Sequence, residues 1–168
     1  MKINLINLHE GVNDLHFQVK PIDLGFDEDA EMLSLFPNDI HVTGEIQKFS
    51  DKYFIKVELQ THAHFACDRC LEDFDQKIDG NFKLIYSKQT RDKFAETDDY
   101  RILGDKTTEI DLSSDIRENL LLTLPMKHLC KDDCRGLCAQ CGANLNSEIC
   151  NCKQEDIDPR WEKLKRLK

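Results

Sequence analysis

The eight cysteines of this chain of 168 residues lie in two stretches, and their spacing is typical of metal ligands. Cys67 and Cys70 form a C-x2-C pair, and Cys138 and Cys141 form a second pair, which Gly142 follows. A C-x2-C turn places two thiolates on one edge of the tetrahedron that zinc favours, and a glycine after it lets the backbone turn beneath the metal. The sequence therefore predicts zinc bound by thiolates.

Two groupings of the eight thiols are compatible with the spacing. In the first, the last four cysteines form a local site, and the pair at 67 and 70 joins the pair at 130 and 134. In the second, the two C-x2-C pairs form one long-range site and some thiols are spare. The candidate ligands are Cys67, Cys70, Cys130, Cys134, Cys138, Cys141, Cys150 and Cys152. Four thiolates for each ion leave no open position, so we expect one or two structural zinc ions, and we prefer two.

Other chemistries find little support in the residue pattern. The cysteine spacings do not match those of ferredoxins, and a redox C-x-x-C would need a βαβ context, which is absent. Phosphate-binding glycine loops, nucleophile elbows and H-E-x-x-H motifs are also absent. His62 and His64 are expected to face solvent, and the acidic stretches at 27–31 and 96–99 are expected to be solvated loops. We therefore predict that the protein is not an enzyme.

The first residues, MKINLINLHEGVNDLHF, contain no apolar run long enough for a signal peptide, and no stretch approaches the roughly 20 apolar residues of a membrane span. We therefore expect a cytoplasmic protein that does not enter a membrane. Because the cytoplasm is reducing, cysteines there are expected to bind metal and not to form disulfides.

The net charge of −9 is unevenly distributed. Residues 1–125 contain 14 Lys and Arg against 25 Asp and Glu, whereas residues 159–168 contain 5 against 1. An acidic body disfavours broad binding to a phosphate backbone and suits a basic protein partner. The candidate RNA-binding residues are therefore those of the basic end: Arg160, Lys163, Lys165, Arg166 and Lys168. The alternative for this end is a solvated helix face that docks through Trp161, Leu164 and Leu167.

Alternating apolar residues predict strands within 15–19, 40–46, 55–67 and 74–86, and a further strand is expected at 3–8. The second and third of these are expected to form a hairpin that leads to Cys67. Leu15, Phe17 and Val19 are expected to point inward. Residues 87–107 lack periodicity and are expected to form a loop.

Residues 112–124 show the clearest helical pattern, with Asp111 or Ser113 as the cap and Pro125 as the stop. Leu112, Ile116, Leu120 and Leu124 recur every four residues, and Leu121 and Leu122 widen the apolar stripe, so we expect the last turns to be buried. A second helix is expected after Asp158, with Pro159 at its first position.

These elements predict an α+β fold with an antiparallel β-rich body, one docked helix, a C-terminal cysteine-rich zinc-binding segment and a short terminal helix. The body is expected to cover residues 1–125 and to include the helix at about 112–124. The cysteine-rich segment is expected at 126–155, packed on the body, and the basic terminal helix at 156–168.

Three blocks of sequence together resemble the YceD family, which is named for accumulation of large-subunit ribosomal RNA. They are CDRCLEDF, EIDLSSDIRENLLLTLP and CKDDCRGLCAQCGANLNSEICNCKQEDIDPRWEKLKRL, and the similarity extends from about residue 40 to the end. The resemblance implies a bacterial protein that supports production or stability of 23S rRNA, with chloroplast relatives that act in rRNA maturation. It supplies no catalytic residue.

With this resemblance, the leading hypothesis is a non-enzymatic factor in assembly of the large ribosomal subunit. Its expected partners are the subunit precursor, through a basic ribosomal protein or 23S rRNA. The alternatives are an rRNA-processing enzyme, which would need a carboxylate or His–carboxylate cluster in a cleft, and a zinc-dependent regulatory module that binds nucleic acid, which would need a concentrated basic face.

Overall fold

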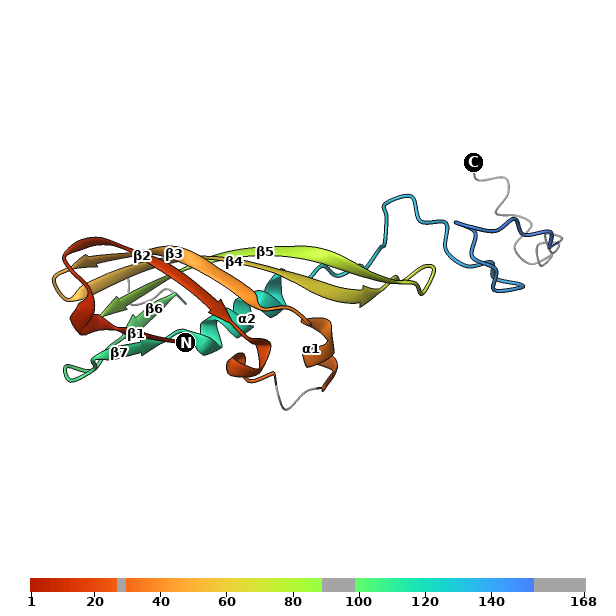
Figure 1. Cartoon of the computed structure of the whole chain (residues 1–168). Coiled ribbons are helices and arrows are strands. Elements are labelled where there is room, and N and C mark those ends of the chain that lie inside the picture. Colours follow the sequence, from red (N-terminus) through yellow and green to blue (C-terminus); the bar gives the residue numbers. More distant parts are fainter. Residues whose placement is uncertain (27–29, 89–98, 153–168) are drawn as a thin grey trace, which may run out of the picture.

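A five-stranded sheet with the strand order β2-β3-β4-β5-β6 is the main layer of the computed structural model, which describes residues 1–26, 30–88 and 99–152 (Figure 1). Its strands are β2 (Gly11–Val19), β3 (Ile40–Phe49), β4 (Lys52–Ala66), β5 (Asp73–Ser87) and β6 (Tyr100–Ile102). A second sheet pairs β1 (Lys2–Asn4) with β7 (Glu109–Asp111). The predicted α+β class is confirmed.

The long hairpin of β4 and β5 forms the centre of the sheet. The two strands pair along their whole length, from Lys52 opposite Ser87 to Ala66 opposite Asp73. Burial alternates strictly along β4, because successive side chains of a strand point to opposite faces. The periods of two that predicted strands within 15–19, 40–46, 55–67 and 74–86 are therefore confirmed.

One face of the sheet carries the core. The helix α2 (Ser113–Thr123) packs on β5, and α1 (Ala30–Leu35) packs on β4, and Figure 1 shows both helices on the same side of the sheet. Leu112, Ile116 and Leu120 are fully buried, as their four-residue spacing predicts. Two 3-10 helices, η1 (Leu5–Asn7) and η2 (Pro21–Leu24), supply Leu5 and Leu24 to the same core.

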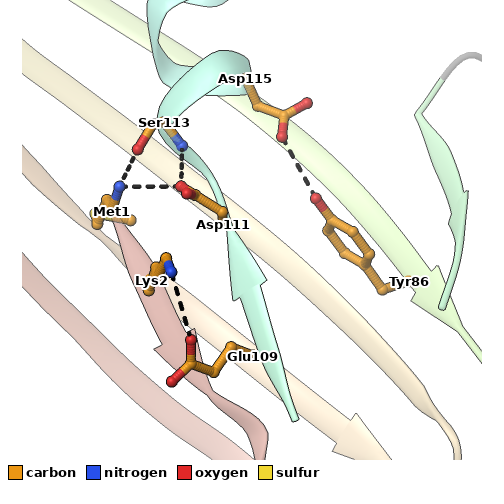
Figure 2. A network of polar contacts seen from close by, with 7 residues as sticks. All are labelled: Met1, Lys2, Tyr86, Glu109, Asp111, Ser113 and Asp115. Atoms are coloured by element: carbon orange, nitrogen blue, oxygen red, sulfur yellow. Dashed lines mark hydrogen bonds and ion pairs between the residues drawn. The ribbon is translucent and has the colours of Figure 1, made fainter. Parts of the chain in front are cut away.

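The start of α2 is held by a polar network that joins it to β1 and β7 (Figure 2). The Oδ1 atom of Asp111 accepts the N–H of Ser113 at 2.9 Å and lies 3.0 Å from the α-amino group of Met1, which also contacts the hydroxyl of Ser113. Lys2 pairs with Glu109 at 3.8 Å. The residue in the cap position is Leu112, so Asp111 performs the predicted capping from one residue earlier.

A second polar group connects α2 to the sheet through Asp115, which is 8% exposed. Its carboxylate accepts the Tyr86 hydroxyl at 3.4 Å, as Figure 2 shows, and lies 3.7 Å from the Arg101 guanidinium. Burial raises the pKa of Asp115, although Arg101 opposes the shift. Burial and the neighbouring Asp115 likewise raise the pKa of Tyr86. The contact between Arg101 and Asp115 connects the short strand β6 to α2.

Several sequence predictions about the strands were wrong in detail. Within the expected loop 87–107, Tyr100–Ile102 form β6, which pairs parallel with β5, so the main sheet is not wholly antiparallel. A strand of three residues is too short to show a period. The expected strand at 3–8 ends at Asn4, whose side chain accepts the N–H of Ile6 at 2.9 Å and starts a 3-10 turn.

Two predicted core side chains are exposed. Phe17 is 37% exposed because β2 is an edge strand, and nothing described covers its outer flank. Leu122 is 82% exposed, because it lies on the side of α2 that faces away from the sheet. The short helix α1 was not predicted, and it has no buried residue that could have produced a pattern.

Some predictions lie outside the described residues. They are the terminal helix 156–168 with the five basic candidates for RNA binding, and most of the acidic stretches at 27–31 and 96–99. Within the described part of the chain, no helix combines the length and apolar character needed to cross a membrane.

Two neighbouring leucines of α2 test the packing. Leu120→Ala should lower the free energy of unfolding by about 2–5 kcal/mol, because it leaves a cavity between helix and sheet. Leu122→Ala, the matched control, should change it by less than about 0.5 kcal/mol. Urea unfolding followed by circular dichroism measures both values, and equal effects would refute the described orientation of α2.

The Asp111 network predicts a dependence of stability on pH. Hydrogen bonds from the backbone and side chain of Ser113, and then the Met1 amine, lower the pKa of Asp111 to about 2. The unfolded value is about 3.9, so the ionised group stabilises the folded state above that pH, and the contribution is lost as pH falls toward 2. The stability difference between wild type and Asp111→Asn should therefore narrow below about pH 4. A difference that stays constant from pH 7 to pH 3 would contradict this.

Candidate metal centres

The first cysteine tetrad brings together Cys67, Cys70, Cys130 and Cys134, whose sulfurs all lie within 4.8 Å of one another. The Sγ atoms of Cys67 and Cys134 are 3.8 Å apart, and those of Cys70 and Cys130 are 3.6 Å apart. Four thiolates at about 2.3 Å from a zinc ion would form a tetrahedron with edges of about 3.8 Å. The sulfur positions therefore match the geometry that zinc requires.

This tetrad lies at the tip of the β4–β5 hairpin, where the C-terminal segment meets the body (Figure 1). Cys67 follows the last residue of β4 directly, and Cys70 is the last residue of the same turn. The Cys67 N–H donates to the Glu72 carbonyl at 2.9 Å, and the Leu71 N–H donates to the Cys67 carbonyl at 2.9 Å. These backbone hydrogen bonds fix the turn, so that the sulfurs of Cys67 and Cys70 converge on one position.

The other two ligands of the first tetrad come from the chain after α2, 60 or more residues later. The ring of His128 stacks on Phe65 with centroids 4.1 Å apart, and the backbone N–H of His128 donates to the Asp68 carboxylate at 2.7 Å. The Arg69 guanidinium donates to the Cys134 carbonyl at 2.9 Å. These contacts hold the incoming segment against the hairpin turn.

The second tetrad is local and consists of Cys138, Cys141, Cys150 and Cys152, again within 4.8 Å of one another. The Cys150 sulfur lies 3.2 Å from that of Cys138 and 3.6 Å from that of Cys141. The Gly142 N–H donates to the Cys138 carbonyl at 2.9 Å and closes the C-x2-C turn. Gly142 has a φ of +74°, a conformation that favours glycine.

The tetrads differ in burial. Three of the first four cysteines are at most 4% exposed, whereas none of the second four is buried and Cys141 and Cys152 are exposed. The first centre is therefore shielded by Phe74, Leu129 and Leu137, which pack around it. The second centre is shielded by no comparable group of described side chains.

The electrostatics of the thiols indicate a cation site. The N–H of Cys130, with others of the turn, lowers the pKa of Cys67 to about 6, and the N–H of Cys141 helps lower the pKa of Cys138 to about 6. Burial and the neighbouring thiols raise the pKa of Cys130 to about 12. Four sulfurs this close cannot all ionise without a positive charge among them, and a divalent cation supplies that charge.

The donor set fits a structural metal. Each tetrad offers four sulfurs and no oxygen or nitrogen, which is the ligand set of structural zinc sites. When bound, the metal would join two chain segments and stabilise the folded state. The structure thus groups the cysteines as in the first of the two arrangements that the spacing left open, and the two C-x2-C pairs do not share a site.

Several residues around the first tetrad were not singled out from the sequence. The Asn146 amide donates to the Cys134 sulfur at 3.3 Å, and the Asn144 amide donates to Glu72 at 2.8 Å. Burial raises the pKa of Cys134, but the hydrogen bonds from the Asn146 amide and from the N–H of Gly136 outweigh it. The net shift of the Cys134 pKa is therefore downward. The only sequence signal for Asn144 and Asn146 was the turn composition of GANLN.

The two histidines that were expected to face solvent do so. His62 and His64 are exposed on β4, on the face opposite the core. The His64 ring lies 2.8 Å from Asp75, and the hydrogen bond raises the pKa of His64. Neither histidine belongs to a group of potential metal ligands among the described residues.

Comparisons with known proteins agree with the resemblance that the sequence blocks indicated. The model of the family described as "Large ribosomal RNA subunit accumulation protein YceD" matches residues 55–168, which is more than half of the chain. The chain belongs to the YceD family. The matched part contains both cysteine tetrads, α2 and most of the β4–β5 hairpin.

The similar proteins come from bacteria and plants. An uncharacterised protein of Mycobacterium bovis is 37% identical over 100 residues, covering 58% of this chain and 47% of its own. A chloroplastic protein of Arabidopsis thaliana, named large ribosomal RNA subunit accumulation protein YCED homolog 1, is 23% identical over 77% of this chain and 48% of its own. A protein of Zea mays with the same name is 29% identical over 59% of this chain and 43% of its own.

The chain spans about half the length of these curated relatives. No solved structure matches it.

Two glycines near the tetrads test how tightly the segment is held. Gly136 and Gly142 both have a φ of +74°, but a Cβ on Gly136 would lie 2.9 Å from the Arg69 carbonyl, whereas a Cβ on Gly142 would meet nothing within 4 Å. Each alanine substitution should cost about 1 kcal/mol from backbone strain. Gly136→Ala should in addition break the hydrogen bond from Leu137 to Arg69.

Hydrogen exchange of the Leu137 amide measures this. The amide should exchange faster in Gly136→Ala, and its rate should stay close to that of wild type in Gly142→Ala, the matched control. Equal protection of this amide in the two variants would contradict the close approach of segment and hairpin.

Proposed function

We propose that this protein is a non-enzymatic, zinc-containing factor that supports accumulation of 23S rRNA and assembly of the large ribosomal subunit in the bacterial cytoplasm. The observation that carries the proposal is membership of the YceD family, whose description names large ribosomal RNA subunit accumulation. The plant relatives bear the same description in their names. The proposal extends that role to this chain.

The metal is proposed to be zinc and its role structural. In support, eight thiols in two tetrads provide four sulfur donors for each ion, and a fully thiolate-bound zinc has no position left for a substrate or for water. The ions would stabilise the C-terminal segment, which has little apolar core of its own.

The absence of catalysis is likewise a proposal. In support, the groups of potential metal ligands in the described residues are the two cysteine tetrads, and neither includes a histidine or carboxylate that could act as a general base. The buried Asp115 is already engaged by Tyr86 and Arg101, which link it to the sheet.

The partner is proposed to be a precursor of the large subunit, contacted through a basic ribosomal protein, rRNA or both. The strongly acidic body supports contact with basic protein, because complementary charge speeds association and suppresses wrong partners. The basic residues between 160 and 168 support contact with RNA.

Fractionation of ribosomal particles on sucrose gradients tests the proposal. In lysates of producing cells, the protein should sediment with precursors of the large subunit and not with mature 70S ribosomes. Loss of the gene should lower the ratio of 23S to 16S rRNA, and re-expression should restore it. A protein found only at the top of the gradient, with an unchanged rRNA ratio in the deletion strain, would refute the proposed role.

A further inference from the structure

The side of the main sheet opposite α1 and α2, called here the outer face, is covered by no described element (Figure 1). Solvent faces of antiparallel sheets are usually polar, because alternate side chains point to water. Most of the outer face follows this rule, with Glu58, Gln60 and His62 along β4. The end of the face next to the β3–β4 turn does not follow it.

At that end, a row that is apolar except for Gln47 crosses four strands. Val12 pairs with Gln47, Gln47 pairs with Phe54, and Phe54 pairs with Ile85, so these four side chains stand side by side on the outer face. Phe49 extends the row, with its ring 6.2 Å from that of Phe54 and edge-on to it. Phe49 is 56% exposed and Val12 is 52% exposed, so water contacts apolar side chains on both sides of Gln47.

The row borders a groove with a volume of about 300 Å³. Phe54 and Ile85 line its apolar side, and Lys56 and Lys83, which pair directly across β4 and β5, line its other side together with Glu45. Lys56 lies 3.0 Å from Glu58, whereas Lys83 forms no ion pair with any residue that the structure describes. The name aromatic groove is used below for Phe54, Lys56, Lys83 and Ile85, which line the groove, together with Phe49, which lies beside Phe54 at its border.

We propose that the aromatic groove binds an unpaired stretch of RNA, with bases stacked on Phe49 and Phe54 and phosphates next to Lys56 and Lys83. The inference rests on the proposed function and names the surface that would contact rRNA. Aromatic rings on a sheet surface offer π-faces on which any base can stack, and single-stranded binding sites combine such rings with cations along the backbone.

The charge pattern favours RNA over a protein at this place. The centres of protein–protein interfaces are depleted of lysine, because its strongly hydrated charge is costly to bury. Here two lysines flank the row, Glu45 is the acidic residue that lines the groove with them, and Glu58 pairs with Lys56 but leaves Lys83 unpaired among the described residues. The acidic character of the rest of the body confines binding to this end of the face, so only a few phosphates would be contacted and the salt dependence should be shallow.

Fluorescence anisotropy with the zinc-loaded full chain tests the proposal. The probe is a labelled single-stranded RNA of mixed sequence and about ten nucleotides, within the usual range of site sizes. Phe54→Ala combined with Phe49→Ala should weaken binding by roughly tenfold or more, because each substitution removes the ring on which one base stacks. Lys83→Gln should weaken it less and lower the salt slope by about 0.7.

Two matched controls separate this surface from the rest. Leu122→Ala removes an exposed apolar side chain from α2, on the opposite side of the sheet, and Lys77→Gln removes a lysine from the other end of the outer face. Both should bind the RNA as wild type does. Circular dichroism of all variants should show an intact fold, because the substituted side chains lie outside the core.

Three results would overturn the proposal: no binding of single-stranded RNA by wild type, equal binding by the phenylalanine double variant, or equal weakening by the control substitutions. If wild type does not bind RNA but the double variant loses association with particles in cells, the groove contacts a protein instead. If RNA binding behaves as expected but the protein does not sediment with precursors, the proposed role in assembly fails while the groove stands.

Discussion

Convergence of the first cysteine tetrad is the constraint on which the C-terminal half of the structure depends. Two of its thiols sit at the tip of the β4–β5 hairpin and two come from the chain beyond α2. Between residues 126 and 152, only Cys134 and Gly136 are buried, so this segment has almost no apolar core. Such a segment cannot gain much folding free energy from hydrophobic burial, and the polar contacts to the hairpin and the proposed metal would have to supply it.

The body depends on ordinary packing, and the two faces of its sheet differ in composition. The inner face carries α1 and α2, and its buried side chains account for the core. Asp111 and Asp115 fix α2 at its first turn, one through β1 and the other through the sheet and β6. The described helices pack on the inner face, and no described element covers the outer face.

Much of this arrangement could be predicted from local pattern. The alternation along β4 and the four-residue spacing in α2 are strong signals, because each reports one buried face directly. Thiol spacing predicted equally well that the cysteines converge in groups that could hold a metal. The spacing could not decide which cysteines share a site. The pair that joins Cys67 and Cys70 depends on where the chain lies in space after α2. The three residues of β6 and the exposure of Phe17 and Leu122 also depend on tertiary neighbours and leave no trace in a short window.

The central claim is that each tetrad holds one zinc ion and that the first ion joins the hairpin to the C-terminal segment. The most direct measurement is the zinc content, by atomic absorption, of protein purified without chelator. Wild type should contain about two equivalents, and Cys134→Ser and Cys150→Ser about one each. Only Cys134→Ser should make residues 126–137 susceptible to limited proteolysis, since the second tetrad is local. Less than half an equivalent in wild type, or loss of both ions from Cys150→Ser, would contradict the account.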